Sequence, residues 1–266
     1  MLISRDSLYK PSVSSSLPKK IWTYWNSEDL PKSIQYCMTT WKTHNPDYEI
    51  TLITNTNLPR YLHGFDISTF RHADSLARIS DVVRLHVLAR HGGVWMDASM
   101  ICNRSFNWLE DMLQGKEFFG YYMNSFTKTP AYPVIESWFF ACIPNSPFVG
   151  HWRDTFMKMN KFDTVQAYIN ALKTAGTDPQ GIPPSLQSYL AIHMAAQYVL
   201  QVLKYPTSKL ALLKCEDGPF QYLVRNSWDS EKAIKEVVEN RVKTDLIKLR
   251  GDERKVFDKL CCPYTI

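Results

Sequence analysis

The sequence lacks the features that mark membrane and secreted proteins. No window of eighteen apolar residues is available for a membrane span, and the first twenty residues contain no apolar run of the kind found in signal peptides. We therefore expect a soluble, cytoplasmic protein without a transmembrane segment. The stretch Asn103-Arg104-Ser105 fits a glycosylation sequon, but it carries no weight without a secretory signal.

Cysteine and glycine motifs are also scarce. The six cysteines include no Cys-x-x-Cys pair and have no histidine at ligand spacing, which favours reduced core thiols over a zinc site or a disulfide framework. No Walker or dinucleotide glycine motif is present, and the only glycine pair, Gly92-Gly93, is interpreted as a turn. The net charge of +5 comes from Lys and Arg interleaved with Asp and Glu. This distribution argues against a nucleic-acid partner and permits an anionic ligand.

The order of elements near the N-terminus indicates an α/β protein. Residues 1–17 are poor in apolar residues and are expected to be flexible, and residues 18–266 are expected to form one domain with a helical C-terminal part. Residues 21–25 form a predicted strand, Pro31 begins an amphipathic helix that stops before Pro46, and residues 49–53 form the next strand. This strand, helix, strand order is typical of a doubly wound α/β sheet.

Residues 76–100 are the most informative stretch, and they predict a helix, a turn and a strand. Asp74 and Ser75 are good helix N-caps, and Gly92 lies where a C-capping glycine is expected. The helix spans roughly 15 Å from Asp81 to its end, and a strand returning to Asp97 covers roughly 13 Å. Asp97 should therefore lie beside Asp81, with Arg84 on the same helix face. Taken singly, a solvated helix pair and a turn aspartate would be the ordinary explanations.

The combination Ser80-Asp81-x-x-Arg84 and Gly92-Gly93-Val94-Trp95-Met96-Asp97-Ala98-Ser99 resembles the capsular polysaccharide synthesis family of GT-A glycosyltransferases. These are relatives of the DXD-containing sugar-transferase family, which includes fungal mannosyltransferases and clostridial glucosylating toxins. The resemblance implies a GT-A fold, a Rossmann-like mixed sheet flanked by helices. It also implies that Asp81 and Arg84 bind the donor sugar and that Asp97 meets the ribose and the metal diphosphate.

The resemblance extends to a divalent cation, Mn²⁺ or Mg²⁺, with Asp97 and Ser99 as ligands and His193 as a weaker candidate. Ser99 departs from the family's third DXD carboxylate, and a hydroxyl is a poorer ligand for these ions. A base-stacking aromatic in the first strand is also implied, with Trp22 as first choice and Tyr24 and Trp25 behind it. The full set of donor-binding candidates is Trp22, Thr23, Tyr24, Arg78, Asp81, Arg84, Asp97, Ala98 and Ser99.

The rest of the chain carries weaker signals. Residues 135–142 form a predicted strand beside the donor pocket, in which Glu136 and Trp138 are acceptor-side candidates, although a solvent-facing glutamate is the commoner case. Helices are predicted for residues 147–160, 164–175, 186–203 and 230–249. The apolar stripe of the last helix would dock on the protein or form a homodimer. Ser227 and Trp228 faintly resemble a diphosphate-contacting pair in the related toxins.

The leading hypothesis is a glycosyltransferase that moves a monosaccharide from a nucleoside diphosphate sugar, expected to be a UDP-sugar, to a glycan hydroxyl. Retention of configuration and assistance by a divalent metal are implied by the resemblance. One alternative is a catalytically inactive module that binds a nucleotide sugar or a glycan, suggested by the missing DXD carboxylate. A weaker one is a sugar-nucleotide hydrolase or phosphotransferase that uses Asp81 and Asp97.

Overall fold

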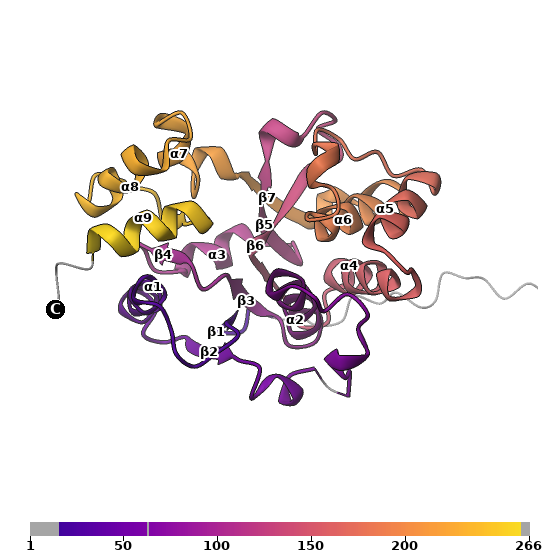
Figure 1. The fold of residues 1–266 in the computed structure, drawn as a ribbon, viewed down its shortest axis with the longest axis horizontal. Coiled ribbons are helices and arrows are strands. Elements are labelled where there is room, and N and C mark those ends of the chain that lie inside the picture. The colour runs from indigo at the N-terminus through magenta and orange to yellow at the C-terminus, as the bar shows by residue number, and fades with distance from the viewer. Residues whose placement is uncertain (1–15, 63, 262–266) are drawn as a thin grey trace, which may run out of the picture.

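The computed structural model describes residues 16–62 and 64–261 and contains a six-stranded mixed sheet (Figure 1). Its strand order is β2-β1-β3-β6-β5-β7. Strands β1, β2 and β3 are mutually parallel along their pairings, β6 runs antiparallel to both β3 and β5, and β7 is parallel to β5. The strand bounds are β1 Lys20–Tyr24, β2 Glu49–Ile53, β3 Gly93–Met96, β5 Phe118–Met123, β6 Val134–Cys142 and β7 Leu210–Lys214. The predicted α/β class with a mixed central sheet is confirmed.

Helices cover both faces of this sheet and enclose two hydrophobic cores. Alternate side chains of β3 enter opposite cores, because successive residues of a strand point to opposite faces: Trp95 enters one core, and Val94 and Met96 enter the other. The Trp95 face is covered by α2 (Leu76–His91), α4 (Pro147–Met157), α5 (Val165–Thr174) and α6 (Ala191–Gln201). The other face is covered by α1 (Lys32–His44), α3 (Asn107–Met112), α7 (Gln221–Arg225), α8 (Ser230–Val238) and α9 (Gly251–Cys261).

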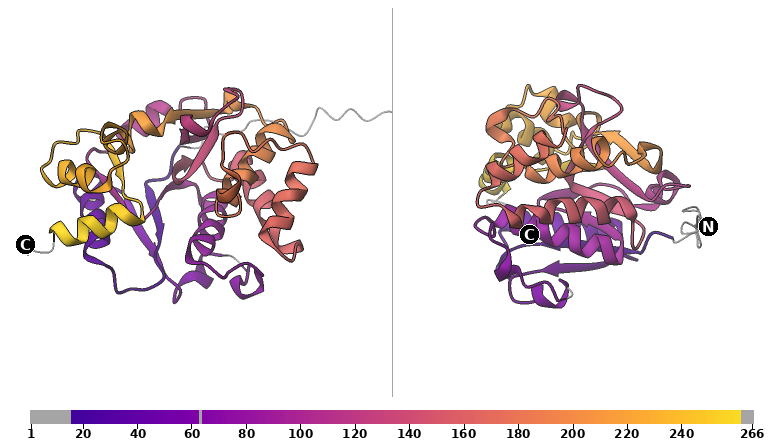
Figure 2. Two further views of the ribbon diagram at one scale, coloured as in Figure 1. Left: turned by 45° about the horizontal axis from the view of Figure 1, so that its top comes forward. Right: turned by 90° about the vertical axis from the view of Figure 1, so that its right-hand side faces the viewer.

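A second, two-stranded sheet joins the C-terminal segment to the segment that follows β3. Strand β4 (Met100–Cys102) pairs antiparallel with β8 (Leu246–Lys248), and Met100 lies opposite Lys248. The backbone N–H of Leu249 also donates to the carbonyl of Ser99 at 3.0 Å. Figure 1 shows the C-terminal helices α8 and α9 beside β4 and α1, on the opposite side of the molecule from α4 to α6, and the left view of Figure 2 shows the same separation. Residues about 150 positions apart in sequence therefore share one region.

The predicted helix over residues 230–249 is wrong in its second half. Helix α8 ends at Val238, and Asn240 has a positive φ of 54°, a conformation that asparagine adopts readily after a helix. Leu246 and Ile247 then lie in β8 instead of on a helix. Both side chains are buried in the core, as is Val242, so they cannot form the proposed dimer stripe.

Other boundaries differ less. The helix predicted over residues 186–203 begins only at Ala191, and α9 was not predicted. The predicted flexible segment of residues 1–17 lies outside the described residues except for Ser16 and Leu17, and Leu17 is buried in a core. Across the described parts of the chain, every helix is too short or too polar to cross a lipid bilayer.

The turn between α2 and β3 requires glycine. Gly92 has φ 61° and ψ −159°, and Gly93 has φ 92°. A Cβ atom on Gly92 would lie 2.5 Å from the backbone nitrogen of Pro144 and 2.7 Å from the carbonyl oxygen of Cys142. The indole N–H of Trp22 donates to the Gly92 carbonyl at 3.0 Å, which fixes the turn from the neighbouring strand. The chain reverses tightly enough here for β3 to run back along α2.

We predict that Gly92→Ala destabilises the protein by about 3 kcal/mol, because the substitution adds backbone strain to a steric clash with backbone atoms. Gly115→Ala is the matched control, since Gly115 also has a positive φ of 68° but has open space around it. It should cost about 1 kcal/mol, the strain contribution alone. Urea unfolding followed by circular dichroism measures both values, and equal losses would contradict the steric explanation.

Candidate functional site

A cavity of about 660 Å³ opens at the carboxyl ends of β1 and β3. Its wall is built from segments distant in sequence: the first turns of α2, the residues after β3, the middle of β6, the start of α6 and the region from Lys248 to Arg254. This is the sheet edge at which α/β proteins usually bind ligands. Its ionisable lining residues within the described chain, tyrosines apart, are Asp81, Arg84, Asp97, Glu136, His193, Lys248, Arg250 and Arg254.

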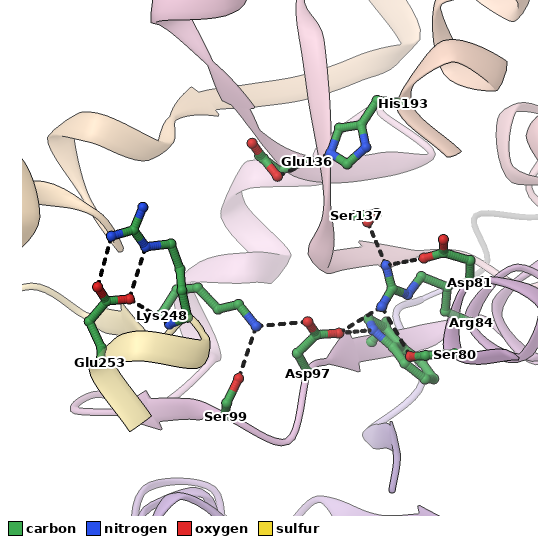
Figure 3. Close-up of polar contacts among 12 residues, drawn as sticks. Ser80, Asp81, Arg84, Asp97, Ser99, Glu136, Ser137, His193, Lys248 and Glu253 are labelled. Carbon is green, nitrogen blue, oxygen red and sulfur yellow. Dashed lines mark hydrogen bonds and ion pairs between the residues drawn. The ribbon is translucent and has the colours of Figure 1, made fainter. Parts of the chain in front are cut away.

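Asp81 and Asp97 meet at this cavity, as the sequence predicted, and Arg84 lies between them (Figure 3). The Arg84 guanidinium forms an ion pair with Asp81 at 2.8 Å and donates a hydrogen bond to Asp97 Oδ1 at 2.9 Å. Asp81 and Arg84 lie on one face of helix α2. The turn at Gly92 reverses the chain, so that Asp97, directly after β3, lies beside them. The side chains of all three are mostly withdrawn from water, which strengthens these ion pairs.

Neighbouring groups fix the Arg84 side chain further. Its two terminal nitrogens also donate to the hydroxyls of Ser137 on β6 and Ser80 on α2. The indole N–H of Trp95 donates to Asp97 Oδ1 at 3.0 Å. Asp97 and Arg84 are thus held by α2, β3 and β6 together, and the cluster has little rotational freedom.

Lys248 is the main site residue that the sequence analysis missed. Its ammonium donates to Asp97 Oδ2 at 2.7 Å and to Ser99 Oγ at 2.9 Å (Figure 3). The pairing of β8 with β4 brings it there, and the Tyr222 hydroxyl donates to the Lys248 carbonyl at 2.7 Å. The wrong helix over residues 230–249 hid this residue. The positive-φ tendency of Asn240 was a local sign that the helix stops earlier.

The surrounding charges set the ionisation of this cluster. Burial by itself would raise the pKa of Asp97, but the neighbouring Lys248 and Arg84 cations outweigh burial and hold it below its usual value. Burial lowers the pKa of Lys248, and Asp97 opposes that effect. Burial raises the pKa of Asp81 to about 6, against the opposing influence of Arg84. Asp97 is therefore the carboxylate that stays charged, and Asp81 titrates closer to neutrality.

The residues present do not fit the predicted divalent cation. The expected ligands, Asp97 Oδ2 and Ser99 Oγ, both accept a hydrogen bond from the Lys248 ammonium. Mg²⁺ and Mn²⁺ prefer several oxygen ligands, of which carboxylates are the strongest. Across residues 16–62 and 64–261, no group of three His, Cys, Asp or Glu side chains is arranged to hold a metal. His193 is engaged elsewhere, so the third predicted ligand does not join the other two.

Glu136 and His193 form a separate pair in the cavity wall. Glu136 is buried, although a solvent-facing position was the commoner expectation, and its Oε2 lies 3.2 Å from His193 Nε2. The other ring nitrogen of His193, Nδ1, is buried and has no hydrogen-bond partner among the described residues. Trp138 lines the cavity two residues along β6, with its ring stacked on Tyr121 at 5.4 Å. Both acceptor-side candidates therefore reach the cavity.

Three donor-binding candidates do not line the cavity. Trp22 is buried in the core and bonds the Gly92 carbonyl, because it lies two residues before the end of β1. Thr23 is fully buried. Arg78 points toward the Ser188 carbonyl, to which it donates at 3.3 Å. Tyr24 and Ala98 do line the cavity, as predicted.

Two aromatic residues that the sequence analysis named, Trp25 and Trp228, line the cavity together with Arg250 and Arg254, which it did not name. Trp25, just beyond β1, lies under the guanidinium of Arg254 at 5.3 Å. Trp228 lies under Arg250 at 5.0 Å, and Arg250 also forms a two-point ion pair with the buried Glu253. Two aromatic rings with guanidinium groups over their faces thus line the cavity. Ser227, predicted beside Trp228, is not among the lining residues.

A family model described as "Capsular polysaccharide synthesis protein" matches residues 3–169, more than half of the chain. The chain belongs to this family. The matched segment contains Asp81, Arg84 and Asp97, whereas Lys248 lies beyond it. The predicted family is therefore confirmed, and the cluster described above is formed partly by residues within the match and partly by a residue outside it.

Two curated relatives of this family member are glycosyltransferases by name. O-glycosyltransferase braB of Annulohypoxylon truncatum is 24% identical over 160 residues, which cover 53% of this chain and 37% of the relative. Inositol phosphoceramide mannosyltransferase 3 of Schizosaccharomyces pombe (strain 972 / ATCC 24843) is 27% identical over 116 residues, which cover 39% of this chain and 31% of the relative. The matches span only about a third of the length of these relatives.

Similar solved structures include the galactosyltransferase LgtC in complex with donor and acceptor sugar analogues. It has a TM-score of 0.48 and 11% identity, and the likeness covers 93% of this chain and 96% of that one. The ligand-free glycosyltransferase domain of the YGT toxin has a TM-score of 0.45 and 12% identity, with 94% and 90% covered. Likeness of this degree carries no conclusion about ligands, so the site is interpreted from its own residues.

The raised pKa of Asp81 predicts a specific pH dependence of stability. Between pH 3.8, the ordinary pKa of Asp81, and pH about 6, the folded state keeps a proton on Asp81. The unfolded state has already lost this proton. Ionisation of Asp81 should therefore lower the unfolding free energy by about 3 kcal/mol as pH rises through this window.

Asp81→Asn removes this titration, so the stability difference between wild type and variant should change with pH between about 4 and 6 and stay constant above about 7. Urea unfolding at a series of pH values measures the difference. Asp163→Asn, at an exposed ion pair, provides a control with no such change. A pH-independent difference for Asp81→Asn would contradict the raised pKa.

Proposed function

We propose that the protein is a glycosyltransferase that transfers a monosaccharide from a nucleoside diphosphate sugar to a hydroxyl of a glycan. The observation that carries the proposal is the convergence of Asp81, Arg84 and Asp97 on one cavity at the carboxyl edge of the sheet. This cluster lies within the segment matched by the family model. Its composition suits a ligand that has sugar hydroxyls beside an anionic group.

The donor would occupy the cavity in three parts. Asp81 and Arg84 are placed to bind sugar hydroxyls, since a carboxylate accepts from hydroxyls and a guanidinium donates to them. The base would stack on the aromatic residues at the end of β1, Tyr24 and Trp25, in place of the buried Trp22. The diphosphate would face the cationic side chains supplied by β8 and α9. We propose a UDP-sugar as donor, in line with the resemblance in sequence.

In the reaction, the bond between the sugar C1 and the diphosphate oxygen breaks, and its electron pair leaves with the diphosphate. The acceptor hydroxyl oxygen forms the new bond to C1 and loses its proton. We propose that the buried Glu136 accepts a hydrogen bond from this hydroxyl and takes the proton, with His193 holding the carboxylate in place. Positioning and electrostatic stabilisation of the departing diphosphate would supply most of the rate enhancement. The proposal includes retention of configuration, so the acceptor oxygen attacks C1 on the face that the diphosphate leaves; the coupling constant of the product's anomeric proton tests it.

Asp97→Asn is predicted to reduce consumption of the UDP-sugar by about 100-fold or more, because Asp97 is the shared partner of Arg84 and Lys248. Release of UDP from a panel of UDP-sugars, with and without glycan acceptors, measures the effect. Asp47→Asn, at a surface ion pair with Lys19, is the matched control and should be unaffected.

Turnover by Asp97→Asn at the wild-type rate would refute the proposed site. A wild-type protein that binds donors without releasing UDP would support the alternative, an inactive binding module. Turnover that ignores every added acceptor would instead support a sugar-nucleotide hydrolase.

Glu136→Gln is predicted to lower transfer by roughly 10- to 100-fold while the affinity for UDP stays unchanged, since the residue is assigned to the acceptor. Initial rates and calorimetric titration with UDP separate the two effects. Glu110→Gln, at an exposed position on α3, serves as the control. If Glu136→Gln weakened UDP binding as strongly as it slowed transfer, the acceptor assignment would be wrong.

A further inference from the structure

The oxygen atoms at which the resemblance places a divalent cation already have a cationic partner from the chain itself. Lys248 Nζ lies 2.7 Å from Asp97 Oδ2 and 2.9 Å from Ser99 Oγ. The ammonium thus contacts the carboxylate and the hydroxyl that correspond to the two acidic positions of a DXD motif. Its carrier strand, β8, pairs with β4 directly after these residues, so the contact follows from the fold of the main chain.

We propose that the Lys248 ammonium takes the place of the divalent cation and binds the donor diphosphate directly, so that donor binding does not depend on metal. This inference rests on the proposed function, because it concerns the diphosphate of the same donor. Lys248 faces the cavity, and its ammonium carries three N–H donors. Two of them have partners among the described residues, Asp97 and Ser99, which leaves one for a phosphate oxygen.

Further positive charge in the same wall supports this assignment. Arg254 lines the cavity and, within the described chain, forms no ion pair with a carboxylate. Arg250 lines the cavity as well, although Glu253 shares its charge. A diphosphate needs compensation for more than one negative charge, and these cations lie on the same C-terminal segment as Lys248.

A purely structural ion pair is the competing explanation for Lys248. In that case the lysine would only neutralise Asp97, and its removal would affect every ligand of the cavity alike. A diphosphate-binding lysine, in contrast, affects only ligands that carry phosphate. Comparing UDP with uridine therefore separates the two roles.

The test is calorimetric titration of the full chain with UDP, GDP and uridine, either in EDTA or with Mn²⁺. We expect the wild type to bind UDP or GDP with equal affinity in EDTA and in Mn²⁺. Lys248→Met should weaken diphosphate binding by about 10- to 100-fold and leave uridine binding unchanged. Lys255→Met removes the same charge from an exposed position on α9 and should change nothing.

The comparison of EDTA with Mn²⁺ on the wild type keeps the test informative if Lys248→Met fails to fold, because it uses the unaltered chain. The double variant Lys248→Met, Ser99→Asp restores a second carboxylate and removes the competing ammonium. Its diphosphate binding should become dependent on Mn²⁺, which the wild type does not need. Thermal unfolding of both variants shows whether each is folded.

Three results would overturn the inference. A wild type that binds UDP or GDP only with Mn²⁺ would refute the role of Lys248 while leaving the proposed function intact. Equal losses of UDP and uridine affinity in folded Lys248→Met would show that the lysine is structural. Absence of diphosphate binding in both EDTA and Mn²⁺ would overturn the proposed function together with this inference.

Discussion

The site depends on the sharing of Asp97 between two cations. Arg84 donates to one of its oxygens and Lys248 to the other, while Asp81 neutralises the remaining charge on Arg84. Two carboxylates thus face two cations. An unpaired charge in so dry a position would cost several kcal/mol, so none of the four can be present alone. Because its positive and negative charges balance, the cluster keeps ionised side chains in the cavity wall, where an isolated aspartate would be protonated.

Three of these four residues could be derived from the sequence because they are close together in the chain. Asp81, Arg84 and Asp97 lie within seventeen residues, and a helix, a glycine turn and a strand of standard dimensions determine where they meet. The glycine at position 92 made the turn recognisable in the sequence. The structure explains why glycine is needed there, since the positive φ and the adjacent carbonyl of Cys142 leave no room for a side chain. Standard helix and strand dimensions are enough to place residues relative to one another when only two consecutive elements separate them.

Lys248 could not be derived in the same way, because its position depends on a strand pairing between residues about 150 apart. Leu246, Ile247 and Leu249 fit a helical stripe as well as a strand, and only the unpaired edge of β4 decides between them. The error over Trp22 had a different origin. The aromatic run of β1 was recognised, but which of its members reaches the carboxyl edge depends on where the strand ends, and that is the least certain feature of a sequence-based prediction.

The proposed replacement of a metal ion by a lysine would change how the candidate donor site is assembled. A metal binds reversibly and can be lost, whereas Lys248 is attached to β8 and arrives when β8 pairs with β4. Tyr222 holds the Lys248 carbonyl, and the N–H of Leu249 bonds the Ser99 carbonyl, so α7 and the C-terminal segment together determine where the ammonium lies. Docking of the C-terminal segment then completes the proposed donor site. The site therefore gains its full positive charge only when the chain is folded. That charge depends on the fold and not on the concentration of metal ions in solution.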